Sequence, residues 1–298
     1  MLDSLISKRI FASEIIIAFY MLAISAIIAV FHSRIPHWKL FLFFHLLIAV
    51  FIGLILMAYG KFGGRFWRLL RHWYPLILVM CAYRELFYLV HNVNPVDLDK
   101  LFAQWDRWLC GGVNPTVFIE KHIAFPLLTE YLQIVYTMFY FLPGSIGIIL
   151  YAQKKYDAYR LCMAGILAGF FSSFLGFFVL PAIGPRAEFH NWQILPGVFA
   201  AEWLNRTVNS LELTMRDCFP SGHVEVTVIV IWYSFRYTRK AFPAIFVIAT
   251  SLIFATVYLR YHYIVDVIAG IVFATAVILF VDFFNNWWEK KNGLSQNA

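Results

Sequence analysis

Eight long apolar runs decide what this chain can fold into. Each is close to the roughly 20 residues that an α-helix needs to cross the hydrocarbon core of a bilayer. Inside a bilayer only helices and closed barrels satisfy their own backbone groups, and runs of this length favour helices. The sequence therefore predicts an all-α, polytopic membrane protein with about eight transmembrane helices. The predicted spans are Glu14–Phe31, Leu40–Tyr59, Tyr74–Val93, Ala124–Tyr151, Ala158–Leu180, Ser221–Tyr237, Ala241–Tyr261 and Ile264–Phe284.

The composition excludes a soluble domain. Of the 298 residues, 61% are hydrophobic and only 14% are charged, and the mean hydropathy is +0.71. A soluble fold could not cover that much apolar surface. The first run follows Lys8 and Arg9, but it is longer than the apolar core of a signal peptide and no clear cleavage site follows it. We interpret it as a retained membrane span.

The basic residues indicate the orientation of the chain. They concentrate in alternate connections, including Lys61–Arg71, Lys154–Arg160 and Arg236–Lys240. Because cytoplasmic loops are enriched in Lys and Arg, both termini are predicted to be cytoplasmic, in the inner membrane of a bacterium. The same rule explains the net charge of +7 without a nucleic-acid partner. It places the segments Pro181–Cys218 and Arg260–Asp266 on the periplasmic or extracellular side.

The outer segment Asn94–Lys121 carries apolar residues at helical spacing between polar ones. This pattern predicts an amphipathic helix on the membrane surface over Asp99–Leu109. We expect this helix to border the entrance for a lipid and to pack near the loop Pro181–Cys218.

The stretch Cys218–His223 opens the sixth run and has the features of an anion site. Ser221 and Gly222 would stand at a helix start, where unpaired backbone N–H groups and the helix dipole attract a negative group. His223 follows directly. Taken alone, these residues fit a capped helix with an interfacial histidine equally well.

The connection between the seventh and eighth runs adds a second histidine. His262 and Asp266 are four residues apart, so on a helix they would share one face. A carboxylate that holds one imidazole nitrogen leaves the other free to attack. Arg260 and Arg186 could clamp phosphate oxygens. An interfacial ion-pair network is the alternative, but three such stretches at one membrane depth favour a catalytic site.

The remaining polar residues give weaker signals. The four cysteines form no CxxC pair, so a zinc or redox motif is not predicted. Cys110 and Cys218 both fall on the outer side, where a disulfide is chemically permitted. Arg84 and Glu85, inside the third run, would either pair with other helices or line a substrate cavity.

The three outer stretches together resemble the type 2 phosphatidic acid phosphatase superfamily. The resemblance rests on Gly184-Pro185-Arg186, Pro220-Ser221-Gly222-His223 and His262-Tyr263-x-x-Asp266, and it covers about Tyr74 to Phe284. It implies a six-helix, phosphatase-type catalytic membrane domain over residues 73–288. Residues 1–72 would then add two extra N-terminal transmembrane helices with a connecting segment, and residues 289–298 a cytoplasmic tail.

The resemblance also implies a role for each site residue. His262 would be the nucleophile that forms a phosphohistidine, and Asp266 would orient it. His223 would protonate the leaving alcohol. The phosphate ligands would be Arg186, Ser221, Gly222 and Arg260, and neither a metal nor another cofactor would be needed.

Two departures from the superfamily pattern point to one of its branches. The usual lysine before the first motif is missing, and Thr256 stands where an arginine is common. Arg260 lies one helical turn, roughly 5.4 Å, further on and could replace that arginine. The form Tyr-x-Arg-Tyr-His-Tyr is similar to the inositol phosphorylceramide synthase-like branch.

The expected function is therefore a membrane lipid phosphatase or phosphotransferase. It would cleave a lipid-linked phosphate ester at the outer leaflet, among membrane lipids, and pass the phosphoryl group to water or an alcohol. A head-group transferase like inositol phosphorylceramide synthase is one alternative. A non-enzymatic lipid-phosphate carrier is another, although it would need the arginines and not two histidines with an aspartate. The oligomeric state is left open.

Overall fold

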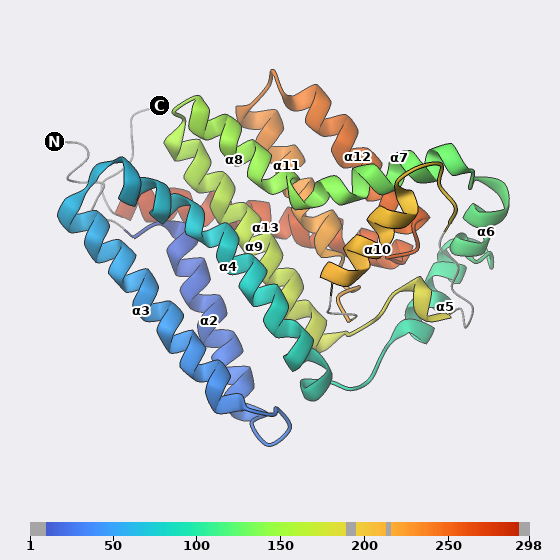
Figure 1. Ribbon diagram of the computed structural model, residues 1–298, viewed down its shortest axis with the longest axis horizontal. Helices are drawn as coiled ribbons and strands as arrows, with labels where there is room; N and C mark the ends of the chain where they lie inside the picture. Colours follow the sequence, from blue (N-terminus) through green and yellow to red (C-terminus); the bar gives the residue numbers. More distant parts are fainter. Residues whose placement is uncertain (1–9, 189–194, 213–215, 292–298) are drawn as a thin grey trace.

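The computed structural model describes residues 10–188, 195–212 and 216–291, except for the side chains of residues 289–291. Every regular element in these residues is a helix (Figure 1), which confirms the all-α class. The helices are α2 (Ala12–Val30), α3 (Trp38–Phe62), α4 (Gly64–Val93), α5 (Asp99–Leu109), α6 (Pro115–His122), α7 (Pro126–Thr137), η1 (Met138–Tyr140), α8 (Leu142–Ala152), α9 (Tyr156–Val179), η2 (Pro185–Glu188), α10 (Ala201–Leu211), α11 (Gly222–Tyr237), α12 (Phe242–Tyr258) and α13 (Ile264–Lys291).

The eight predicted runs all fall on helices, but fewer of these are long enough to span a bilayer alone. Within the described residues, α2, α3, α4, α9 and α13 are long and apolar enough. The segment α7–η1 and α8 would make a sixth span, with a bend of 57°. α11 has 16 residues and α12 has 17. α11 packs against α9, α12 and α13, so its buried Glu225 and Thr227 face protein. Because α11 is surrounded by other helices and not by lipid, its length need not match the bilayer thickness.

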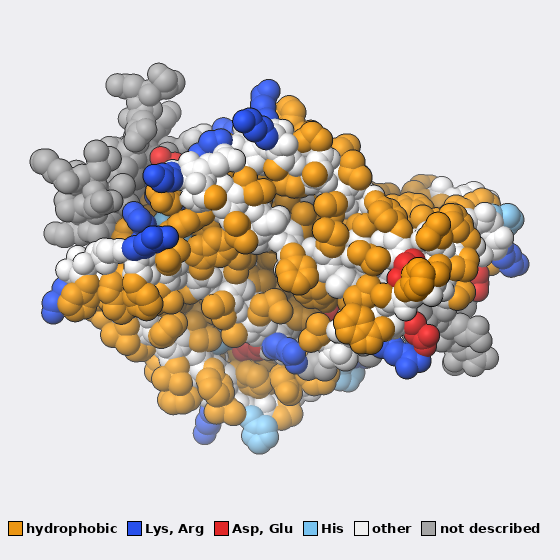
Figure 2. Space-filling model, turned by 45° about the horizontal axis from the view of Figure 1, so that its top comes forward, with side chains coloured by type: hydrophobic (Ala, Val, Ile, Leu, Met, Phe, Trp, Pro, Cys, Tyr) orange, Lys and Arg blue, Asp and Glu red, His pale blue; other side chains and the backbone are white. Residues whose placement is uncertain are grey.

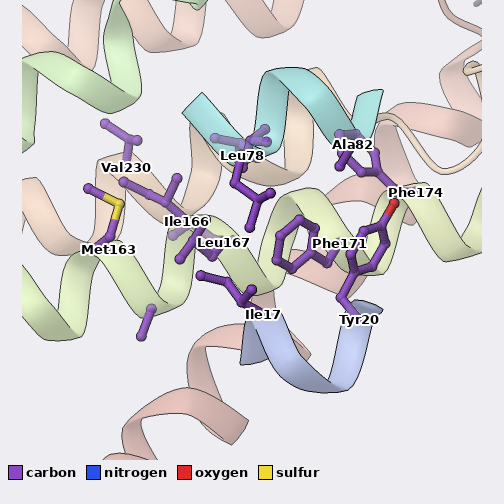
Figure 3. Close-up of a cluster of buried hydrophobic side chains, with 14 of the residues drawn as sticks. Ile17, Tyr20, Leu78, Ala82, Met163, Ile166, Leu167, Phe171, Phe174 and Val230 are labelled. Carbon is purple, nitrogen blue, oxygen red and sulfur yellow. The ribbon is translucent and has the colours of Figure 1, made fainter. Parts of the chain in front are cut away.

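The centre of the bundle is α9, which packs against α2, α4, α8, α11 and α13. Lipid chains are as apolar as the side chains, so close packing holds such helices together. Tyr20 of α2 stacks on Phe171 of α9 with ring centroids 4.0 Å apart. Figure 3 shows the core cluster from four helices: Ile17, Tyr20, Leu78, Ala82, Met163, Ile166, Leu167, Phe171, Phe174 and Val230.

Buried polar pairs join the N-terminal helices to the rest. Arg71 of α4 donates to Glu14 of α2 from Nε (2.6 Å) and Nη2 (2.9 Å). His45 of α3 contacts Glu85 of α4 through Nε2 (3.0 Å) and the Ser25 hydroxyl of α2 through Nδ1 (2.7 Å). Glu85 thus pairs with another helix, one of the two roles expected for it. The division of the chain at residue 72 stays a prediction.

The short helices α5, α6 and α10 lie together at one end of the bundle (Figure 1). The predicted helix Asp99–Leu109 is confirmed as α5, and its place on the membrane surface stays a prediction. Phe102 and Ala103 are buried, whereas Trp108 is 80% exposed. The loop Pro181–Cys218 contains η2 and α10. At the other end, Trp288 Nε1 donates to the Ile10 carbonyl (3.0 Å). Lys and Arg side chains gather near this end in Figure 2.

Candidate active site

Backbone contacts bring the three outer stretches together. The Cys218 N–H donates to the Ala182 carbonyl (3.2 Å), and the Ser221 N–H donates to the Asp266 carbonyl (3.3 Å). Ser221 is the N-cap of α11, and its hydroxyl accepts the Val224 N–H (3.3 Å). The predicted helix start is therefore confirmed. It is an anion-attracting end whose first N–H groups point away from the helix.

Gly184 lets the first stretch touch the third. Its φ is +101°, and a Cβ there would lie 2.4 Å from the Tyr261 carbonyl oxygen, so only glycine fits. The Gly184 and Ile183 N–H groups donate to Asp99 of α5 (2.8 and 3.1 Å). The Tyr263 hydroxyl also donates to Asp99 (3.2 Å). α5 thus packs near the active-site loops, as predicted.

The two histidines face each other. His262 Nε2 lies 3.5 Å from His223 Nδ1. His262 Nδ1 lies 3.0 Å from the Cys218 carbonyl oxygen, which can accept a hydrogen bond only from a nitrogen that carries a proton. This contact assigns the proton to Nδ1 and a lone pair to Nε2. Burial, and then the charge of His223, lowers the pKa of His262 from 6.5 to about 3. His262 is therefore neutral at physiological pH.

Asp266 meets His262, but not on a shared helix face. The helix α13 begins at Ile264, two residues after His262. Asp266 is in its first turn and accepts the Tyr263 N–H through Oδ2 (2.7 Å), as acidic residues do in a capping box. The same oxygen lies 3.6 Å from His262 Nδ1. Asp266 and the Cys218 carbonyl therefore orient the imidazole of His262 together.

Cys218 is part of this hydrogen-bond network. Its thiol donates to Asp266 Oδ2 (2.7 Å). Cys218, His262 and Asp266 each offer a ligand atom, all within 4.8 Å of one another, and these donors suit zinc. Burial, and then the charge of Asp266, raises the pKa of the Cys218 thiol well above its usual range. Cys110 and Cys218 are both free thiols.

Sequence reasoning missed a second carboxylate beside His223. Glu212 Oε1 lies 3.5 Å from His223 Nε2 and accepts the Tyr140 hydroxyl (2.8 Å). Burial opposes ionisation, but the hydrogen bond and charge of His223 and the charge of Arg186 outweigh it and lower the pKa of Glu212. The two histidines therefore lie in a row between Glu212 and Asp266. The only signal for Glu212 was its place in the polar loop before α11.

Arg186 lies in the same cluster, beside an aspartate that also escaped prediction. Its Nη2 lies 3.8 Å from Asp217 Oδ1, and its guanidinium lies 5.6 Å from the ring centroid of Tyr261. Asp217 accepts the Tyr83 hydroxyl (2.6 Å). Burial, and then the charge of Glu212, raises the pKa of Asp217. A phosphate that bound Arg186 would compete with the carboxyl group of Asp217, which contacts Arg186 only at 3.8 Å.

Arg260 lies outside the helix on which the sequence placed it. The helix α12 ends at Tyr258, and Arg260 has φ +69°. Its N–H donates to Val257 and the Tyr261 N–H to Thr256 (both 3.0 Å), the two bonds of a Schellman motif. Its guanidinium lies 2.9 Å from Glu120 of α6. The role of Arg260 in binding phosphate stays a prediction.

A cavity of about 400 Å³ leads to this cluster. Its polar lining includes Glu212, Asp217, Gly222 and His223. The rest is mostly apolar and comes from α4, η1, α8 and α9, for example Met80, Phe139, Pro143 and Phe174. Residues of α5 are not in this lining, although α5 was expected to border the entrance. Arg84 lines the cavity from α4.

Comparison with known proteins agrees with this geometry. The family model of the PAP2 superfamily matches residues 100–280, which runs from α5 into α13. No curated protein and no solved structure matches the chain.

Proposed function

The chain belongs to the PAP2 superfamily, and from this premise we propose that it cleaves a lipid phosphate ester through a phosphohistidine. Membership supports phosphatase-type chemistry, and the apolar helices support an integral membrane protein. The observation that carries the mechanism is the row of four side chains in which two histidines lie between two carboxylates. The apolar cavity beside this row favours a lipid as the substrate.

His262 is the proposed nucleophile. Its Nε2 carries the lone pair, since Nδ1 lies at the Cys218 carbonyl (3.0 Å). Attack on phosphorus forms an N–P bond and places positive charge on the imidazole. Asp266, 3.6 Å from Nδ1, lies where it would stabilise that charge.

His223 is the proposed general acid. A lipid alkoxide leaves poorly unless it is protonated as the P–O bond breaks. Glu212, 3.5 Å from His223 Nε2, would favour the protonated imidazolium. After the alcohol leaves, the neutral His223 could take a proton from the incoming water. The phosphate oxygens would be held by the Ser221 hydroxyl, by the Gly222 N–H, by Arg186 and by Arg260.

The acceptor decides between hydrolysis and transfer. Water on the phosphohistidine releases phosphate, whereas the hydroxyl of an alcohol gives a new ester. A head-group transferase of the inositol phosphorylceramide synthase type would use the second route. A carrier that only bound phosphate would have no use for the paired histidines. We propose the inner membrane of a bacterium, with the site on the periplasmic or extracellular side.

Trapping of the phosphoenzyme by rapid quench tests the mechanism. We expect wild-type protein to carry acid-labile phosphate and His262→Ala to carry none. His223→Ala should lower turnover of alkyl phosphates by about 10²–10⁴-fold, the usual contribution of a general acid. It should largely spare nitrophenyl phosphate, whose leaving group needs no proton.

Three further variants complete this experiment. Glu212→Gln should share the leaving-group dependence of His223→Ala in weaker form, and Asp266→Asn should reduce labelling without abolishing it. Glu202→Gln is the matched control, because Glu202 is 63% exposed and pairs with Arg206 on the surface of α10. Undiminished label in His262→Ala would overturn the assignment of the nucleophile. Release of phosphate and transfer to added alcohols are measured side by side.

A further inference from the structure

Three guanidinium groups gather where the beginnings of α4 and α9 meet. Arg68 and Arg71 are three residues apart on α4, and Arg160 lies near the start of α9. The guanidinium carbons of Arg71 and Arg160 lie 3.8 and 5.0 Å from the ring centroid of Phe11. That of Arg68 lies 5.2 Å from the ring centroid of Tyr156. Aromatic rings attract cations but carry no net charge, so the positive charge of this cluster still needs anions.

His72 lies between the two aromatic rings and joins the cluster. Its ring centroid is 5.8 Å from that of Phe11 and 6.3 Å from that of Tyr156. His72 is only 5% exposed, yet its Nδ1 has no hydrogen-bond partner among the described residues, and the same holds for the buried Nε of Arg68. Buried polar atoms are normally paired, and both nitrogens can donate to an oxygen. Two such nitrogens beside an excess of positive charge indicate an anionic ligand.

The carboxylates of the chain balance only part of this charge. Glu14 accepts two hydrogen bonds from Arg71 (2.6 and 2.9 Å), so this buried pair is complete. Asp157 pairs with Arg160, but its side chain is exposed, so solvent screens the contact. Arg68 contacts no carboxylate in the described part of the chain. The cluster therefore keeps positive charge on α4 and α9 that a ligand could neutralise.

The cluster lies at the depth of lipid head groups. Arg68 is four residues after the first residue of α4, and Arg160 is four residues after that of α9, about 6 Å along each helix axis. Both helices are long and apolar enough to span a bilayer. Phe62 and Phe66, just before Arg68, are exposed apolar side chains that could contact lipid chains. Basic pockets between transmembrane helices are typical binding sites for phospholipid head groups.

We propose that Arg68, His72 and Arg160 bind the phosphate of an anionic phospholipid of the surrounding membrane. Guanidinium groups suit this task because their planar fork can bind two phosphate oxygens at once. A zwitterionic lipid would fit less well, since its head group brings a cation of its own. The site lies near Phe11, at the opposite end of the bundle from α5 and α10, and is independent of the proposed function.

Two lipids with the same chains test the proposal: dioleoyl phosphatidylglycerol, which is anionic, and dioleoyl phosphatidylcholine, which is zwitterionic. The full chain is freed of lipid in dodecyl maltoside micelles, and binding of each lipid is measured by native mass spectrometry. We expect phosphatidylglycerol to bind at least about tenfold more tightly, as hydrogen bonds between charged groups imply. Because it binds the folded state, it should also raise the Tm more than phosphatidylcholine does.

Substitutions locate the site. Arg68→Gln and Arg160→Gln should each weaken binding of phosphatidylglycerol by about tenfold or more. Arg68→Lys should lose less, because lysine keeps the charge. Arg236→Gln is the matched control, since it removes the same charge from a half-exposed arginine that is already paired with Asp282 (2.7 Å). Its affinity for phosphatidylglycerol should stay within about twofold of the wild type.

Three outcomes would overturn the proposal. Equal affinity of the wild type for the two lipids would remove the preference for an anion. An equal loss in Arg236→Gln would assign the binding to general surface charge, and no loss in Arg68→Gln and Arg160→Gln would place the lipid elsewhere, for example in the catalytic cavity. Inorganic phosphate is the further probe: binding of phosphate without binding of phosphatidylglycerol would make the ligand a soluble anion and exclude the lipid. If Arg68→Gln does not fold, judged by its Tm without lipid, Arg160→Gln and the comparison of the two lipids still decide.

Discussion

At the scale of single residues, Arg260 has two competing uses. It was expected to hold phosphate, yet its guanidinium lies 2.9 Å from Glu120, whose side chain is 50% exposed. Arg260 is buried but Glu120 is half exposed, so solvent screens the pair and this contact need not be the reason for the arginine. A phosphate with more charge could displace Glu120.

Paired substitutions separate the two uses. Arg260→Lys should lower kcat/KM for a lipid monophosphate by about tenfold or more, because lysine lacks the two-pronged guanidinium. Glu120→Gln should change it by less than about twofold, since solvent at the half-exposed Glu120 weakens the pair. Phosphate release and thermal unfolding are measured for both variants. Equal losses of activity accompanied by equal losses of stability would make Arg260 a structural link between α6 and α12.

Some of the site residues could be predicted from sequence and others could not. His223, His262 and Asp266 stand in short motifs at helix boundaries, where local spacing and the order of the spans place them on one side of the membrane. Glu212 and Asp217 lie in a polar loop without periodicity, so nothing local fixes their position. Glu212 directly follows α10, and the start of α10 is held by the distant Glu130 of α7, which accepts the N–H groups of Phe199, Ala200 and Ala201.

At the scale of elements, α5 fixes the start of α13. Asp106 accepts the Ile264 N–H (2.8 Å) and the Val265 N–H (3.0 Å). These groups would otherwise be unpaired at the N-terminus of the helix. The sequence could not show this, because Asp106 and Ile264 are far apart along the chain. For the same reason it placed His262 and Asp266 on one helix face, although α13 begins only at Ile264.

The ionisation of Asp106 gives a prediction about pH. Burial raises the pKa of Asp106 from 3.8 to about 6, although both backbone N–H groups act in the opposite sense. The folded state therefore holds this proton more tightly than the unfolded chain. Its contribution to stability is complete below pH 3.8 and is lost as the pH rises through about 6.

Asp106→Asn removes this titration while keeping an acceptor oxygen. We expect the Tm of the wild type to fall more than that of the variant between pH 4 and pH 7. Asp157→Asn is the control, because Asp157 is 71% exposed on α9. Parallel Tm curves for wild type and Asp106→Asn would contradict the raised pKa. Asp106→Ala, which leaves both N–H groups without this acceptor, should lower stability by about 1–3 kcal/mol.

At the scale of the whole molecule, the orientation in the membrane is the main untested prediction. Ile10 and Trp288 are hydrogen-bonded, so the two ends of the described chain lie together, at the opposite end from α5 and α10. Basic residues enriched near the termini favour the cytoplasm for that end.

Labelling of intact cells tests this orientation. A reporter fused after Ala298 should read as cytoplasmic, and a tag inserted at Asn191 should react with a reagent that cannot cross the membrane. Asn191 lies outside the residues that the structure describes. A second tag in the α8–α9 connection at Lys154 serves as the control and should be protected. Labelling at Lys154 with protection at Asn191 would reverse the orientation and move the site to the cytoplasmic face.

The approach of Gly184 to Tyr261 has a consequence for protein engineering. The first loop, the connection from α12 to α13, and α5 share hydrogen bonds through Asp99 and Asp106, with no room for a Cβ between the loops. In a chimera that took one of these three segments from a relative, the transplanted segment would have to pack against the two native segments that remain. Substrate preference could therefore be transplanted between relatives only by exchanging all three segments together.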